Sequence, residues 1–194
     1  MSDDDAEPEM LLRYLQGLRE ALLWKLDGVP EHDVRRPLTA TGTNLLGLVK
    51  HVASMEMGYF TAPLGRPSPV PMPWLEAGAA LNADLYATQE ESREWVRDFY
   101  RTSWRTTDDA VAELGLGAPA QVPWWGENGR TTLGRLLVHL IAETARHAGH
   151  ADILREQLDG AVGMQDGNDN MPPAEDAEWQ DHVVELQRIA DEFL

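Results

Sequence analysis

Apolar residues recur at three- and four-residue spacing along most of this chain, and no segment has the alternating pattern of a half-buried strand. The 3.6-residue period predicts an all-α fold. Pro8 suits a first helical turn, Thr43 is the predicted N-cap of the second helix, and Gly160 ends the fourth. The predicted helices cover approximately residues 8–26, 43–60, 88–114, 131–158 and 174–193.

The third predicted helix opens on Thr88-Gln-Glu-Glu91, a capping-box pattern, and a cap or kink is expected at Thr106–Asp109. About 27 proline-rich residues precede it, which is long for a connection within a bundle. Such a connection lets two consecutive helices run parallel. We therefore predict a four-helix bundle with a long crossover between helices 2 and 3, plus an added C-terminal helix. Its predicted core includes Leu15, Leu22, Leu48, Val52, Leu136 and Leu140.

With 194 residues, of which 43% are hydrophobic, one domain over residues 1–194 is expected. Residues 1–7 form an acidic tail, and residues 161–194 are expected to form a mobile loop and the C-terminal helix. The net charge of −17 argues against binding to nucleic acid or to anionic membranes. Without an apolar run long enough to span a bilayer, or a secretory signal, the expected location is cytoplasmic. Whether the chain forms a homodimer is left open by the sequence.

Glu143 and His147 lie four residues apart in the most apolar predicted helix. This spacing places them on one face, in a stripe with Leu136, Leu140 and Leu154. A buried carboxylate and a buried imidazole are costly unless they are compensated. A divalent metal would compensate both, and a buried hydrogen bond between them is the structural alternative. The chain has no cysteine, so His, Asp and Glu are the residues left to hold a metal.

Other histidines and tryptophans allow two interpretations each. His51 alone is more typical of a half-buried histidine than of a metal ligand. His139 and His150 lie nearer the edge of the Glu143–His147 stripe and suit a pocket wall. Trp124 and Trp125, in the loop before the fourth helix, suit either a cap on the bundle core or one wall of an organic-ligand pocket.

The segment from His139 to Glu156, together with His51 in Asn44-Leu-Leu-Gly-Leu-Val-Lys-His-Val, resembles the DinB-like metal-binding four-helix bundles. Within them the chain is most similar to the mini-circle-protein branch, and also to the bundle domain of the mycothiol-dependent maleylpyruvate isomerase. The resemblance covers roughly residues 10–158. It implies a divalent metal, zinc or nickel, held by His51, Glu143 and His147.

The resemblance also implies an enzyme that uses mycothiol or a similar small thiol for transfer or isomerisation of a small-molecule substrate. Three protein ligands would leave one coordination position open. We expect His150, Trp124 and Trp125 to line the pocket for the thiol, whereas no catalytic residue is assigned. Two alternatives remain open at this stage: a metal-assisted hydrolase, and a non-catalytic bundle that binds a metal or a ligand.

Overall fold

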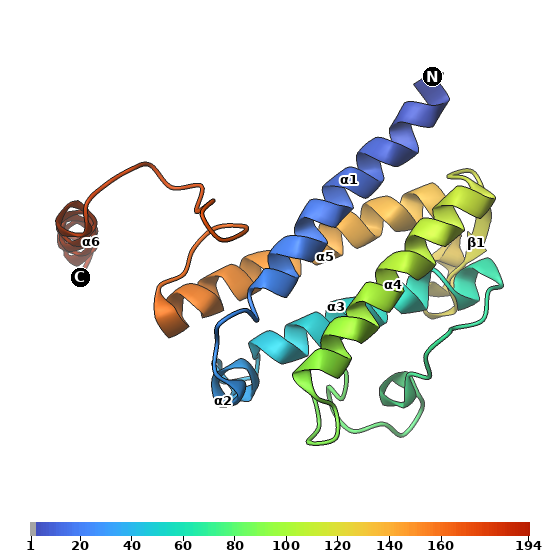
Figure 1. Ribbon diagram of the computed structural model, residues 1–194, viewed down its shortest axis with the longest axis horizontal. Helices are drawn as coiled ribbons and strands as arrows, with labels where there is room; N and C mark the ends of the chain where they lie inside the picture. Colours follow the sequence, from blue (N-terminus) through green and yellow to red (C-terminus); the bar gives the residue numbers. More distant parts are fainter. Residues whose placement is uncertain (1–2) are drawn as a thin grey trace.

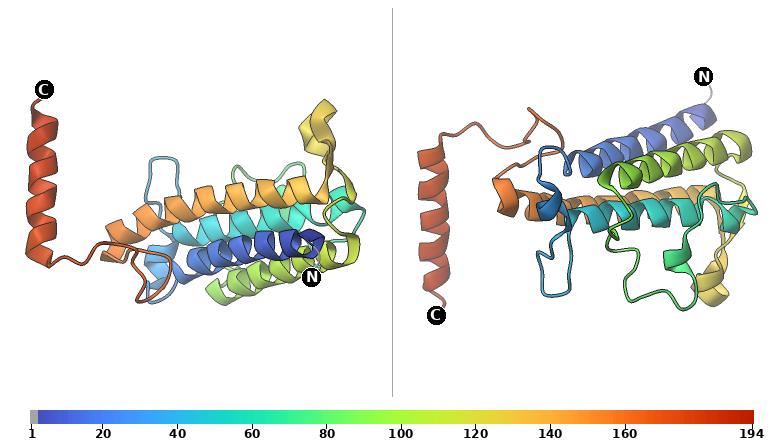
Figure 2. Two further views of the ribbon diagram at one scale, coloured as in Figure 1. Left: turned by 90° about the horizontal axis from the view of Figure 1, so that it is seen from above. Right: turned by 60° about the horizontal axis from the view of Figure 1, so that its bottom comes forward.

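Four long helices lie side by side and carry most of the buried side chains (Figures 1 and 2). The computed structural model describes residues 3–194, with side chains from Glu7 onward. Helix α3 packs on α4 and on α5, and α1 packs on α5 and α4. These helices are α1 (Asp3–Trp24), α3 (Leu45–Tyr59), α4 (Arg93–Leu114) and α5 (Leu133–Asp159). The all-α bundle predicted from the sequence is confirmed.

The predicted core residues are all buried, with exposed fractions of 2% or less for Leu15, Leu22, Leu48, Val52, Leu136 and Leu140. The predicted crossover is also present. Helices α3 and α4 run in the same direction, joined by residues 60–92 along one side of the bundle (Figure 1). Within residues 3–194, no helix is long and apolar enough to cross a membrane.

Short elements complete the chain, and two of them are strands, which the periodicity did not predict. The strands β1 (Pro119–Gln121) and β2 (Arg130–Thr132) pair antiparallel just before α5. The other short elements are α2 (Glu31–Arg35) and the 3-10 turns η1 (Ala62–Leu64), η2 (Pro73–Leu75) and η3 (Pro123–Gly129).

Several predicted helix ends were wrong. Helix α1 begins at Asp3, so Pro8 lies inside it and most of the predicted acidic tail is helical; residues 1–2 lie outside the described part. The N-cap of α3 is Asn44, not Thr43, because its side chain accepts a hydrogen bond from the Gly47 amide. Helix α5 begins after Thr132 and ends at Gly160, as predicted.

Helix α4 begins after Ser92, whose hydroxyl accepts from the Trp95 amide. Thr88 and Glu91 do form the local hydrogen bond of a capping box, but no helix follows directly. The same Glu91 oxygen also pairs with Lys50 of α3, a tertiary contact that the local pattern does not include. The helix then continues unbroken through Thr106–Asp109, so the expected kink is absent from α4.

The C-terminal helix α6 (Asp176–Asp191) stands apart from the bundle in both views (Figure 2). None of its side chains is buried. It begins with a capping box between Glu175 and Glu178, so its start is specified locally. The functional site must therefore be sought among the four long helices and their connections.

Candidate metal centre

His51, Glu143 and His147 converge where α3 packs on α5. Each offers one ligand atom, and these atoms all lie within 4.8 Å of one another. His147 Nε2 is 3.1 Å from Glu143 Oε1, and His51 Nε2 is 3.8 Å from the same oxygen. The two imidazole rings have their centroids 4.7 Å apart. Two nitrogens and one carboxylate oxygen at this spacing form a donor set that suits a divalent metal.

The three side chains lie at the edge of the core, with exposed fractions of 15% for His51, 29% for Glu143 and 13% for His147. The predicted stripe on α5 is therefore rotated: Thr144, Ala148 and Ala151 face the core in place of the Glu143–His147 pair. This edge position leaves the converging atoms reachable from solvent, which an internal position would not.

Asp84 is a member of the site that the sequence analysis missed. Its Oδ2 lies 2.6 Å from His51 Nδ1, and this hydrogen bond lowers the pKa of the Asp84 carboxyl below its ordinary value. An acceptor at Nδ1 keeps the proton there and leaves Nε2 free to bind a metal. Asp84 lies in the irregular crossover, where no periodicity marks it.

The protonation of His147 also suits a ligand. Burial lowers the pKa of its imidazole below the ordinary value, and the nearby His51 ring acts in the same direction. The neutral ring is the form that binds metals. Its buried Nδ1 has no hydrogen-bond partner among the residues that the structure describes, so His147 has no counterpart to Asp84.

His150 lies one turn beyond His147 on α5, with the two ring centroids 5.4 Å apart. It lines a cavity of about 370 Å³ together with Thr39, Thr41, Thr43, Gly149, Ile153 and Leu154. A neighbouring cavity of about 290 Å³ shares Thr41 and Thr43 and extends between residues 41–44 and 81–86. The walls of both cavities are mostly uncharged. Residues 39–43 contribute to the first cavity together with α5, and residues 41–44 and 81–86 contribute most of the second, and the sequence did not single out these irregular segments.

Trp124 and Trp125 lie farther along the bundle, where Tyr59 ends α3. Their ring centroids are 5.4 and 5.7 Å from that of Tyr59, and Trp125 is 5.1 Å from His139. Trp125 packs on the core, whereas Trp124 is 57% exposed. Trp74 of the crossover packs on Trp95 and Phe99 and donates to Ser54.

A comparison with curated proteins finds no significant match. The family model described as Mycothiol-S-transferase matches residues 10–160. The match includes α3, α4 and α5 in full, most of α1, and all three converging residues, whereas α6 lies outside it. It agrees with the DinB-like resemblance found in the sequence. The chain belongs to the mycothiol S-transferase family.

Proposed function

We propose that this protein is a divalent-metal-dependent enzyme that joins a mycothiol-type thiol, through its sulfur, to a small electrophile, which loses a leaving group as the carbon–sulfur bond forms. The observation that carries the proposal is the convergence of His51, Glu143 and His147 within 4.8 Å, inside the segment that the family model matches. The chain has no cysteine of its own, which is consistent with a reacting thiol supplied by another molecule.

A divalent ion held there, with zinc or nickel suited to two imidazoles and a carboxylate, would bind a thiol sulfur and lower its pKa so that it reacts as a thiolate. The protein's contribution is geometric and electrostatic. His51 and His147 would supply imidazole nitrogens, and Glu143 would supply a carboxylate oxygen. Three protein ligands leave a position open for the sulfur.

The remaining part of the thiol and the electrophile need surfaces beside this position. We place one of these surfaces in the cavity that His150 lines, because the His150 ring lies beside that of His147. Trp124 and Trp125, which pack against Tyr59 and His139, would supply an aromatic surface one helical turn before Glu143 on α5. In this proposal His150, Trp124 and Trp125 contact the organic ligands and have no role in holding the metal.

The test uses the full chain loaded with zinc or nickel. Mycothiol is the thiol and 1-chloro-2,4-dinitrobenzene the electrophile, whose absorbance changes when the thiol displaces its chloride. The parent should turn over, and turnover should fall to background after chelation and in His51→Ala and His147→Ala. His182→Ala is the matched control, because it removes a histidine from the exposed helix α6, and it should keep the parent rate. Metal-independent turnover, or unchanged turnover in His51→Ala, would overturn the proposal. Ester hydrolysis without any thiol would favour the hydrolase alternative.

A further inference from the structure

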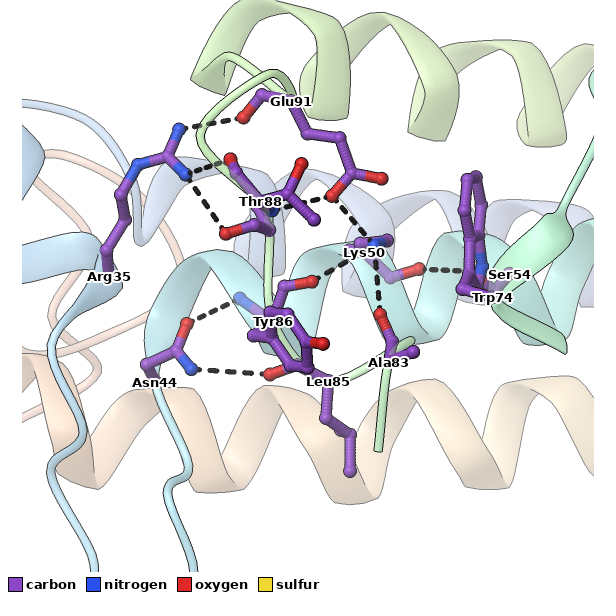
Figure 3. Close-up of polar contacts among 12 residues, drawn as sticks. Arg35, Asn44, Lys50, Ser54, Trp74, Ala83, Leu85, Tyr86, Thr88 and Glu91 are labelled. Atoms are coloured by element: carbon purple, nitrogen blue, oxygen red, sulfur yellow. Dashed lines mark hydrogen bonds and ion pairs between the residues drawn. The ribbon is translucent and has the colours of Figure 1, made fainter. Parts of the chain in front are cut away.

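The crossover segment of residues 83–91 is fastened to α3 by a buried lysine (Figure 3). Lys50, whose side chain is 1% exposed, donates to the carbonyls of Ala83 and Tyr86 at 2.9 and 3.0 Å. It also donates to the Glu91 carboxylate at 2.8 Å. The three hydrogens of one ammonium group are thus all directed at this segment.

Further donors fasten the same segment along its length (Figure 3). Asn44 donates to the Leu85 carbonyl at 3.3 Å. Arg35 donates to the carbonyls of Ala87, Thr88 and Glu91 at 3.2, 2.9 and 2.8 Å. These bonds satisfy backbone groups that irregular chain leaves without helical or strand partners.

Gly47 sets how closely the segment approaches α3. A Cβ at this position would lie 1.9 Å from the Leu85 carbonyl oxygen, so a side chain there cannot coexist with the observed path. The segment is therefore in contact with the α3 backbone, and α3 also carries His51. Asp84 lies between Ala83 and Leu85, whose carbonyls are both held, so its position relative to His51 is fixed by the backbone on either side.

We propose that this fastened segment is a positioning device for the metal centre, in which Asp84 holds the His51 ring so that Nδ1 keeps its proton and Nε2 faces Glu143 and His147. Asp84 is thus a positioning residue, and Lys50 holds the segment that carries it. The inference rests on the proposed metal centre. In this arrangement His51, unlike His147, is oriented by a carboxylate from a distant part of the chain.

The first measurement needs no metal. In the metal-free protein at pH 8, the nitrogen chemical shifts of ¹⁵N-labelled histidine report which ring nitrogen of His51 carries the proton. The parent should have the proton on Nδ1. Asp84→Ala should shift it toward Nε2, whereas Asp84→Asn, whose amide oxygen still accepts a hydrogen bond, should preserve the parent tautomer.

The second measurement is Zn²⁺ affinity by competition with a chromogenic chelator. Asp84→Ala should weaken binding about 10- to 100-fold, the usual effect of losing the outer partner of a ligating histidine. Asp84→Asn should recover most of that loss. Glu90→Ala is the matched control, because it removes an exposed carboxylate from the same segment, and it should change neither the tautomer nor the affinity.

Lys50→Met keeps Asp84 and His51 but removes the three N–H donors of the Lys50 ammonium group. It should shift the His51 ring proton toward Nε2, as Asp84→Ala does. If that variant does not fold, the Asp84 series decides. A parent with the proton on Nε2, or Asp84→Ala with the parent tautomer and affinity, would overturn the inference. A parent that binds no Zn²⁺ would instead overturn the proposed function, and the tautomer comparison would still decide whether Asp84 orients His51.

Discussion

Arg19 of α1 and Glu56 of α3 form an ion pair inside the bundle, with side chains 1% and 0% exposed. Asp108 of α4 accepts a second hydrogen bond from Arg19 at 3.0 Å. Burial raises the pKa of the Glu56 carboxyl above its ordinary value, although Arg19 acts to lower it. Arg19, Glu56 and Asp108 therefore link three helices, and burying the charges of Arg19 and Glu56 carries a substantial desolvation cost.

Removing one partner of this pair should be more harmful than removing both. Glu56→Ala leaves a buried guanidinium whose remaining carboxylate partner is Asp108, so the free energy of unfolding should fall by about 3–5 kcal/mol. Replacing both Arg19 and Glu56 by Met should recover most of this loss, because no buried charge is then left unpaired. Urea unfolding measures both effects. Asp98→Ala, at an exposed ion pair, should leave the midpoint nearly unchanged. A single variant as stable as the parent would contradict this prediction.

Metal binding should stabilise the folded chain. A ligand that binds only the folded state at 100 times its Kd adds about 2.7 kcal/mol to the free energy of unfolding. Zn²⁺ at that excess should produce this gain in the parent and in His182→Ala, and chelation should reverse it. His147→Ala removes one ligand and should show little gain at the same concentration. Equal gains in all three proteins would place zinc binding elsewhere.

Two glycines of α3 should respond to alanine in opposite directions. Gly47→Ala places a Cβ against the Leu85 carbonyl oxygen and should cost about 1–3 kcal/mol of stability, because backbone must move. Gly58→Ala meets nothing within 4 Å and should gain about 0.5–1 kcal/mol, because alanine favours the helix. Thermal unfolding distinguishes the two. Similar effects at both positions would show that the crossover does not lie on Gly47 in solution.

Asp159 should make stability depend on pH. Arg155 donates to its oxygens at 2.9 and 3.0 Å, and this hydrogen bond lowers the pKa of Asp159 below its ordinary value of 3.8. A carboxyl with a lowered folded pKa contributes stability above its unfolded pKa and loses it as pH falls through the folded pKa. Asp159→Asn should therefore be less stable than the parent at pH 6. The difference should narrow once the pH falls below 3.8, and a constant difference down to pH 2 would contradict this prediction.

The C-terminal helix should be dispensable for the bundle. None of the α6 side chains is buried, so removal of residues 171–194 deletes no core contact. The truncated chain should keep the parent's urea midpoint and its Zn²⁺ affinity. A lower midpoint would show that α6 packs on the bundle in solution, and would contradict this prediction.

Much of the fold could be predicted because its signals are local. The stripes of leucine on α1, α3 and α5 follow from a period that each helix repeats within itself, and Gly160 ends α5 through its own left-handed backbone. The start of α4 could not be predicted in this way. Thr88 and Glu91 have the local pattern of a helix start, but Lys50 and Arg35 bind that segment as turns and bends, and contacts between distant residues outweighed the local preference.

The candidate site likewise has a part that local spacing predicts and a part that depends on tertiary packing. The sequence alone determined that Glu143 and His147 share a face of α5, because four-residue spacing fixes their proximity. Resemblance to a family selected His51, but only the packing of α3 on α5 brought its Nε2 to 3.8 Å from Glu143. The tertiary structure alone decided that Asp84 would contact His51. Its position depends on where an irregular segment is fastened by Lys50, Asn44 and Arg35, and these long-range bonds leave no periodic trace in the sequence.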